Sequence, residues 1–191
     1  MKAAVGLRNP GPDYELTRHN VGWEVVEAVA HDHGGRLGRG PSRTRCQTGE
    51  VTIGGQRLLL AAPLTFMNES GGPVRALVDY FDIPAEDLLV VHDDIDLPFG
   101  RLRLQSGGGT GGHNGLRSIE GALGHRSFSR LKVGVGRPPG RMDPAAFVLR
   151  RFTKAERREV DLLVADAVDV VADWVNDVEA ATRRAGERKV G

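Results

Sequence analysis

The spacing of apolar residues along the chain alternates between two periods, which predicts strands and helices in turn. Short apolar or alternating runs predict strands at 2–7, 46–53, 56–62, 88–91, 101–105 and 130–135. Apolar residues at helical spacing predict helices at 21–33, 70–81, 113–123 and 154–185. This alternation favours an α/β fold. At 191 residues and 40% hydrophobic content we expect a single domain over 1–191.

Turn-forming residues separate these segments. Asn9-Pro10-Gly11-Pro12 ends the first strand, and Asn20 is placed to cap the helix that follows His19. Gly54-Gly55 between two apolar runs predicts a tight hairpin. The Pro- and Gly-rich segment 136–143 predicts a mobile loop before the last helix.

The composition indicates in which cellular compartment the protein works. No apolar run approaches the roughly 20 residues that span a bilayer, and the apolar stretch within 1–10 is too short for a signal peptide. Cys46 is the only cysteine, so neither an internal disulfide nor a thiolate metal cluster can form, and we expect this residue to be structural. We therefore expect a cytoplasmic protein without membrane contact.

Basic residues are concentrated in one part of the chain, although the net charge is only +1. Between 97 and 142 the one acidic residue is Glu120, against eight basic ones: Arg101, Arg103, Arg117, Arg126, Arg130, Lys132, Arg137 and Arg141. Two interpretations stay open at this point. The segment binds an anionic partner, or it is a solvated surface balanced by the acidic C-terminal helix.

Glycines 107, 109 and 112 have the spacing of a dinucleotide-binding loop. The acidic residue expected about 20 positions later is missing, because the next strand has Arg130 and Lys132 there. A Gly-Lys-Ser/Thr phosphate loop is also absent from the sequence. The glycines better fit a sharp turn, or a backbone that approaches a ligand closely with N–H groups free for an anion.

Two further chemistries are weakly supported. One is a divalent metal site, because carboxylates and imidazoles are common metal ligands. Its ligands would be His113 together with the residues at the end of the fourth predicted strand, namely His92, Asp93, Asp94 and Asp96. Their spacing matches no established metal motif. Ser70 lacks a nucleophile elbow and fits a helix start.

A set of polar residues in separate loops remains. It consists of Asn9, His19, Asn68, Asp93 and Asn114, with Asp93 at the carboxyl end of a strand. A carboxylate commonly holds an imidazole as a general base, and side-chain amides can donate to an ester carbonyl. Singly, each residue fits a cap or turn better than catalysis. Together, they favour a hydrolytic site.

These segments resemble the bacterial-type peptidyl-tRNA hydrolase family over nearly the whole chain. The resemblance rests on Tyr14 and on the segments 5–11 (VGLRNPG), 17–22 (TRHNVG), 63–71 (PLTFMNESG), 92–100 (HDDIDLPFG), 111–117 (GGHNGLR) and 128–136 (FSRLKVGVG). It implies a twisted mixed β-sheet between helices, a three-layer α/β/α arrangement. It also implies a monomer that needs neither cofactor nor metal, and whose substrate is peptidyl-tRNA.

The resemblance also implies residue roles. His19 would be the catalytic histidine, oriented by Asp93, and Asn114 would position water and stabilise the transition state. The implied substrate-binding residues are Asn9, Tyr14, Met67, Asn68 and His113, with Arg103, Lys132 and Arg130 in a positive patch that meets the acceptor-stem phosphates. This interpretation requires a fold that brings His19 within hydrogen-bonding reach of Asp93 in an open groove.

The chain departs from the family pattern at three positions. Arg8 stands where the family usually has glycine, Ala62 replaces a frequent lysine, and Gln105 sits at a usually basic patch position. Two rival functions stay open. One is a non-catalytic RNA-binding relative, and the other is a metal-dependent phosphoesterase that uses His92, Asp94, Asp96 and His113.

Overall fold

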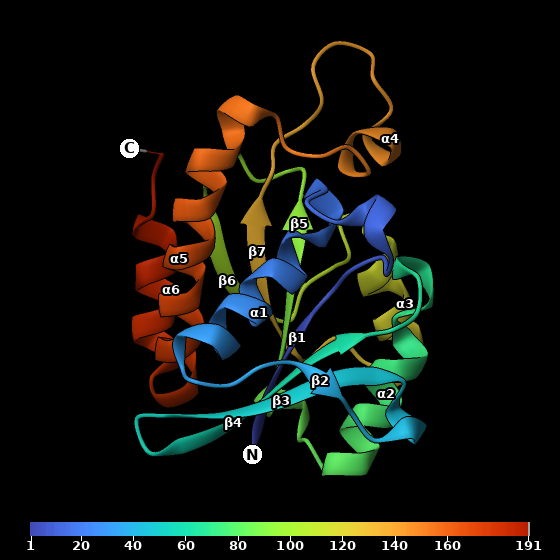
Figure 1. The fold of residues 1–191 in the computed structure, drawn as a ribbon, viewed down its shortest axis with the longest axis vertical. Helices are drawn as coiled ribbons and strands as arrows, with labels where there is room; N and C mark the ends of the chain where they lie inside the picture. The colour runs from blue at the N-terminus through green and yellow to red at the C-terminus, as the bar shows by residue number, and fades with distance from the viewer. Residues whose placement is uncertain (191) are drawn as a thin grey trace.

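A seven-stranded mixed sheet runs through the centre of the molecule (Figure 1). The computed structural model describes residues 1–190 of the chain. The strands are β1 (Lys2–Gly6), β2 (Gly38–Arg39), β3 (Cys46–Ile53), β4 (Gln56–Pro63), β5 (Leu88–Asp94), β6 (Leu102–Ser106) and β7 (Ser129–Gly134). They lie in the order β2-β3-β4-β1-β5-β7-β6. The central four, β4, β1, β5 and β7, are parallel, and the outer pairings are antiparallel.

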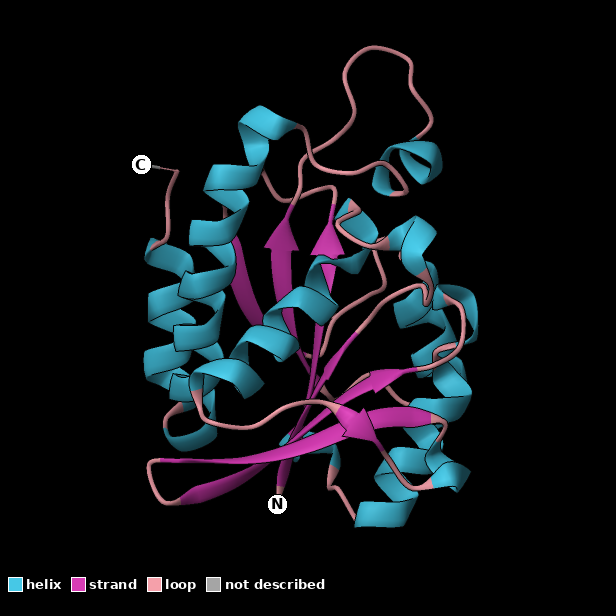
Figure 2. Cartoon of the chain, in the orientation of Figure 1, coloured by secondary structure: helices cyan, strands magenta, loops and turns pink. Residues whose placement is uncertain are grey.

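Helices cover both faces of this sheet, as Figures 1 and 2 show. One hydrophobic cluster joins the sheet to α1 (Val21–Asp32), α5 (Lys154–Asn176) and α6 (Val178–Glu187). A second cluster joins the other face to α2 (Gly71–Phe81) and α3 (Asn114–Leu123). The predicted three-layer α/β/α arrangement is confirmed. Of the helices described within 1–190, none is both long and apolar enough to cross a membrane.

The apolar runs of the central strands follow from burial on two sides. In β5, Leu89 and Val91 belong to the cluster with α1, whereas Leu88 and Val90 belong to the cluster with α3. Because successive side chains point to opposite faces, a strand between two helical layers needs an apolar residue at every position. This is why 88–91 forms an unbroken apolar run.

Two glycine pairs are required by local geometry. Gly54 and Gly55 have φ values of +56° and +81°, which confirms the predicted tight hairpin between β3 and β4. Gly22 in α1 lies so close to β5 that a Cβ there would be 2.1 Å from the carbonyl oxygen of Val91, and Gly6 of β1 is equally crowded by Gly22. The first turn of α1 is therefore pressed onto β1 and β5, which fixes the position of the residues just before it.

The predicted helix over 154–185 is wrong in one respect, because the chain breaks there into α5 and α6. Asn176 at the end of α5 donates to the carbonyl of Ile53 in the hairpin, 3.1 Å away. Asp177 is extended and its side chain accepts from the backbone N–H of Ala180 at 3.0 Å, so it starts a new helix. The apolar stripe continued across this break, which concealed it.

Three other features differ from the sequence expectation. Strand β5 continues beyond the predicted 88–91 as far as Asp94, because it pairs with β7 through that residue. The two-residue β2 was not predicted. Neither was α4 (Pro144–Val148), which follows the predicted loop at 136–143. Asp143 caps α4 and Pro144 occupies its first turn.

Candidate active site

The carboxyl ends of the four parallel strands meet at one edge of the sheet, where a cleft of about 510 Å³ lies. This edge is at the top of Figure 1, where the arrows of β5 and β7 end below α4. Residues that follow β1, β4 and β5 line the cleft together with Lys132 of β7 and the start of α3. In open α/β sheets, this edge is the usual place for ligands.

Asp93 at the centre of the cleft is held between two histidines. The Nδ1 atom of His19 lies 2.9 Å from both carboxylate oxygens of Asp93, and the Nε2 atom of His113 lies 2.9 Å from Oδ1. Asp93 is only 2% exposed, whereas the side chain of His19 is 13% exposed and lines the cleft. The fold therefore places His19 in hydrogen-bonding reach of Asp93 in an open groove, as the sequence interpretation required.

The hydrogen bonds assign a tautomer to each of these histidines. His113 is the cap of α3, and its Nδ1 accepts from the backbone N–H groups of Gly115 and Leu116 at 3.1 and 3.3 Å. Its proton is therefore on Nε2, which donates to Asp93. His19 donates to Asp93 from Nδ1, so its Nε2 keeps a free lone pair. The role of His113 in supporting Asp93 was missed, because the sequence does not reveal that a capping histidine meets this carboxylate.

Burial and pairing shift the pKa values of these groups in different directions. Burial alone would lower the pKa of His19, but the charge and hydrogen bond of Asp93 outweigh it and raise that pKa above its usual 6.5. Burial alone would raise the pKa of Asp93, yet the two histidines hold it well below its ordinary value. Burial lowers the pKa of the neighbouring His92 to about 3, so this imidazole is neutral. The site thus combines a fixed, ionised carboxylate with a histidine whose pKa that carboxylate raises.

Asn9 is fixed on three sides. Its Oδ1 accepts from the backbone N–H of Met67 at 2.7 Å, which turns its amide N–H₂ away from that contact. Its own backbone N–H and carbonyl are bound by the Oδ1 and Nδ2 atoms of Asn20 at 2.8 and 2.9 Å. The expectation that Asn20 caps α1 with its side chain is therefore wrong, because the side chain is occupied with Asn9. Asn20 instead locks a cleft residue in place.

Two further amides lie exposed on the cleft. Asn68 is on a 3-10 turn (Met67–Glu69), and Asn114 is the first residue of α3. Within residues 1–190 neither side-chain amide has a hydrogen-bond partner. Ser70 nearby is fully buried and donates to the carbonyl of Met67, so it is not available as a nucleophile. These two amides are thus among the polar groups that line the cleft together with His19.

The remaining predicted residues lie at different distances from the cleft. Lys132 lines it, with Nζ 3.9 Å from an oxygen of Asp94. Arg103 is exposed on β6 and lies opposite Lys132 of β7 in the strand register, so these two basic residues are neighbours. Tyr14 is outside the lining and packs edge-on against Phe66, the residue before Met67.

Arg130 cannot belong to a surface patch, so the prediction for this residue is wrong. It is fully buried, forms an ion pair with Glu120 at 2.8 Å and donates to the carbonyl of Gly108. It alternates with the apolar residues Leu131 and Val133 along the strand, yet its own side chain is also buried, beneath the glycine-rich segment. Its role is to hold that segment, which lines the cleft.

Comparison with known proteins shows the family to which the chain belongs. The sequence profile of the family described as Peptidyl-tRNA hydrolase matches residues 3–190. The chain belongs to the peptidyl-tRNA hydrolase family. A peptidyl-tRNA hydrolase from Kineococcus radiotolerans is 50% identical over 188 residues, covering 94% of both chains. One from Frankia casuarinae is 52% identical over 180 residues, covering 94% of this chain and 90% of the relative. A crystal structure of peptidyl-tRNA hydrolase from Acinetobacter baumannii matches with a TM-score of 0.92 at 32% identity, covering 100% of this chain and 97% of the other.

The three departures from the usual family pattern are accommodated locally. The side chain of Arg8 lies over the ring of Trp23 at 5.1 Å, and its Nε donates to the carbonyl of Pro63 at 3.4 Å, so it joins β1, α1 and the end of β4. Ala62 is fully buried. Gln105 donates to the carbonyl of Gly107, which supports the start of the glycine-rich segment.

The proposed phosphoesterase metal set does not assemble. Within residues 1–190, the one group of three or more possible ligands that gathers closely is His19, Asp93 and His113. Asp96 instead pairs with Arg137, and His92 donates from Nδ1 to the backbone carbonyl of Asp93. The close group is itself a poor ligand set, because the Nε2 of His113 carries the proton that it donates to Asp93.

An apolar wall of the cleft was missed in the sequence. It is formed by Ile95 after β5 and by residues of α4 and its end, namely Pro144, Ala145, Val148 and Leu149. The pair Asp143-Pro144 is a helix-start signal that could have indicated α4. The cleft therefore has a polar floor at Asp93 and an apolar side at α4.

Proposed function

We propose that this chain hydrolyses the ester bond between a peptide and the 3′-terminal ribose of tRNA. The observation that carries the proposal is the hydrogen-bonded pair of His19 and Asp93 in an open cleft lined by three asparagines. Membership of a hydrolase family supports the same reaction class. We include in the proposal that the protein acts as a monomer in the cytoplasm.

His19 acts as the general base in this scheme. Its Nδ1 proton is held by Asp93, so the lone pair of Nε2 takes a proton from a water molecule as that water attacks the ester carbonyl. The resulting imidazolium is stabilised by the adjacent carboxylate, which remains ionised. The proton then passes to the departing ribose oxygen. No covalent intermediate is needed, because the ribose hydroxyl is a fair leaving group.

The asparagine amides stabilise the negative oxygen that forms during the attack. Amide N–H₂ groups donate to this oxygen without changing the net charge of the site. Asn9 is prearranged for this role, because its Oδ1 already accepts from the N–H of Met67 and its side-chain N–H₂ remains available to donate. Asn114, without a partner inside residues 1–190, orients the water or the oxyanion. Asn68 and Met67 contact the 3′ end of the substrate.

Positive side chains beside the cleft hold the acceptor-stem phosphates. Arg103 and Lys132 are adjacent across β6 and β7, and Lys132 reaches the cleft. Contacts to phosphates carry no base information, so many tRNAs are accepted.

The deciding experiment follows release of the blocked amino acid from an N-blocked aminoacyl-tRNA, with chelator present. We expect turnover in the unchanged chain and its loss by about 100- to 10,000-fold in His19→Ala, with tRNA binding retained. Near-normal turnover in His19→Ala would refute the role of His19. Binding without turnover in the unchanged chain would indicate the RNA-binding alternative, and loss of activity in chelator would indicate a metal-dependent enzyme.

A further inference from the structure

Arg18, the residue before His19, has a buried side chain with an unusual number of partners. Its side chain is 5% exposed. The NH1 group donates to the backbone carbonyls of Phe147, Arg150 and Arg151 at 3.5, 3.3 and 3.1 Å. The NH2 group forms an ion pair with Glu156 at 2.8 Å. One guanidinium thus gathers four oxygens from the segment that ends α4 and begins α5.

Aromatic and backbone contacts reinforce these four bonds of the Arg18 guanidinium, which together form the Arg18 clasp. The guanidinium carbon lies 4.0 Å from the ring centre of Phe147 and 5.4 Å from that of Phe152, within the range of cation–π attraction. The backbones also pair, since Thr17 bridges Arg151 and the N–H of Arg18 donates to the carbonyl of Arg150 at 3.1 Å. This backbone pairing uses no atom of the Arg18 side chain, so its hydrogen bonds do not depend directly on the guanidinium.

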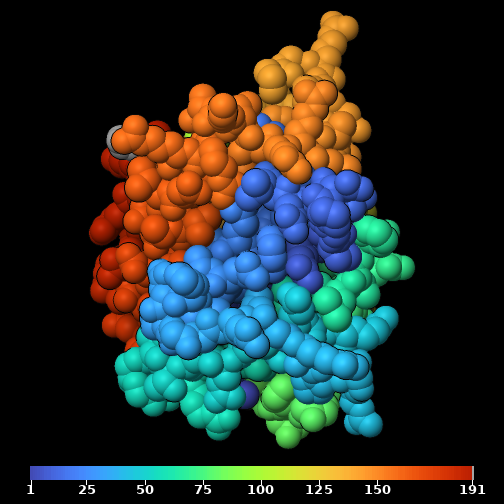
Figure 3. Space-filling model, viewed as in Figure 1, coloured from blue at the N-terminus to red at the C-terminus, as the bar shows by residue number. Residues whose placement is uncertain are grey.

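The clasped segment carries the apolar wall of the cleft. Pro144, Ala145 and Val148 of α4, with Leu149, line the cleft on the side that follows the loop at 136–143. In Figure 3 the lighter orange projection at the top is the loop at 136–143, and α4 lies below this loop, as Figure 1 shows. The turn that holds Arg18 (Arg18–Asn20) is the main contact of α4 among the helices and strands. The position of the wall therefore depends strongly on this one turn.

We propose that Arg18 is a positioning residue that fixes the α4 wall of the cleft at a set distance from His19. It does so because its guanidinium binds the segment that carries the wall, while its backbone is joined directly to the next residue, His19. The inference rests on the proposed function and adds to it that the wall contacts the substrate bound in the cleft. Loss of the clasp then weakens substrate binding, whereas His19 keeps its own bond to Asp93.

Arginine is required here by geometry as well as by charge. A planar guanidinium presents several N–H donors in a rigid fork, whereas a lysine ammonium is a single point of donation on a flexible stem. Lysine could keep the ion pair with Glu156 but not the carbonyls of Phe147, Arg150 and Arg151 together. Glu156 is itself fixed, because its Oε1 also accepts from the backbone N–H of Thr153 at 2.8 Å in the capping box of α5.

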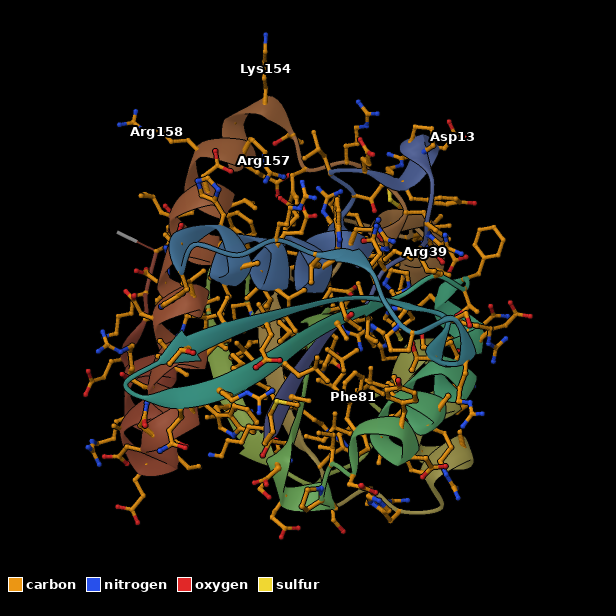
Figure 4. All side chains as sticks on the ribbon, turned by 60° about the horizontal axis from the view of Figure 1, so that its bottom comes forward. Asp13, Arg39, Phe81, Lys154, Arg157 and Arg158 are labelled. Atoms are coloured by element: carbon orange, nitrogen blue, oxygen red, sulfur yellow. The ribbon has the colours of Figure 1, made fainter. Side chains whose placement is uncertain are left out.

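The test compares Arg18→Met and Arg18→Lys with a matched control, Arg157→Met. Arg157, labelled on the first turns of α5 in Figure 4, is also partly buried and paired with Glu24 and Asp161, and it lies 5.8 Å from the same Phe152 ring. It has no hydrogen bond to the α4 segment among the described residues. The control therefore removes a comparable arginine from α5 without releasing the wall.

Two measurements are made on each variant. Hydrogen exchange of the ligand-free chain reports the protection of amides at 144–151. Steady-state kinetics with an N-blocked aminoacyl-tRNA separate KM from kcat. For Arg18→Met we expect faster exchange at 144–151 and a KM raised about 10-fold with kcat within about 2-fold. Arg18→Lys should give a smaller change of the same kind, and Arg157→Met should change neither quantity.

Several outcomes would overturn the inference. Unchanged exchange at 144–151 in Arg18→Met means that the side chain does not hold the wall. Equal KM changes in Arg157→Met mean that any lost arginine on this side has the same effect. If Arg18→Met does not fold, Arg18→Lys decides, and an unchanged KM there refutes the proposal. Absence of turnover in the unchanged chain would instead refute the proposed function, and the exchange measurement would still test the clasp.

Discussion

Substitution of Asn20 separates two roles that the sequence does not distinguish. As a helix cap, Asn20 could be replaced by Asp or Ser at little cost, because these residues cap helices about equally well. As the lock on Asn9 it cannot, since its Nδ2 donates to the carbonyl of Asn9 and its Oδ1 accepts from the N–H of the same residue. An aspartate would place a carboxylate oxygen against that carbonyl. The variants to compare are therefore Asn20→Asp, Asn20→Ser and Asn20→Ala.

The size of the effect follows from the groups left without partners. Both bonds are buried, at 2.8 and 2.9 Å, and Asn20 itself is 1% exposed. Each buried backbone group left unsatisfied costs about 1–3 kcal/mol, so for two groups we expect Asn20→Ala to lower the free energy of unfolding by about 2–6 kcal/mol. Asn20→Asp should lose a comparable amount, whereas a role limited to capping predicts a loss within about 0.5 kcal/mol for Asp or Ser.

Urea unfolding and turnover together test this reasoning. Unfolding gives the loss of stability, and kinetics at a temperature where every variant is folded should show turnover reduced by about 10- to 100-fold, because Asn9 loses its fixed position. A Thr153→Ser variant, which keeps the cap of α5, serves as a control for a conservative change at a helix start. If Asn20→Asp and Asn20→Ser keep both stability and turnover, the lock on Asn9 is not the role of this residue.

Two further predictions concern charge. His19 must be unprotonated to act as a base, so activity falls as pH drops through its raised pKa. In Asp93→Asn the carboxylate that raises this pKa is gone, while the burial that lowers it remains, so the pKa of His19 falls. We expect that variant to be about 100- to 10,000-fold slower, with the acid limb of its kcat/KM profile moved to lower pH, and an unmoved limb would contradict the assigned pair. For Arg103→Ala, the slope of log affinity for tRNA against log salt should become shallower by about 1. Arg57→Ala, in the hairpin at the opposite end of β4, is the control, and equal slopes in both variants would remove Arg103 from the patch.

The sequence by itself determined most of the strands and helices, and it supplied the polar residues of the site. The apolar run 88–91 predicted a strand, and Gly54-Gly55 predicted a tight hairpin, because these signals depend only on neighbours in the chain. Sequence expectations were wrong for residues whose partners are distant. Arg130, which the family resemblance placed in a positive patch, pairs inward with Glu120, and the stripe from 154 to 185 continues across the break at Asp177. Both depend on contacts made by other elements.

Only the tertiary structure decided how the polar residues work together. His19, Asp93 and His113 are brought together by the turn Arg18–Asn20 before α1, the end of β5 and the start of α3, which lie up to 94 positions apart (113 minus 19). The assignment of the His113 proton, and hence of its bond to Asp93, follows from where the backbone N–H groups of α3 point. The side chain of Asn20 binds the backbone of Asn9 and does not cap α1 as predicted, because a buried amide binds the partners that the packing places beside it. Such choices are set by the positions of groups in space, and the order of residues along the chain does not contain them.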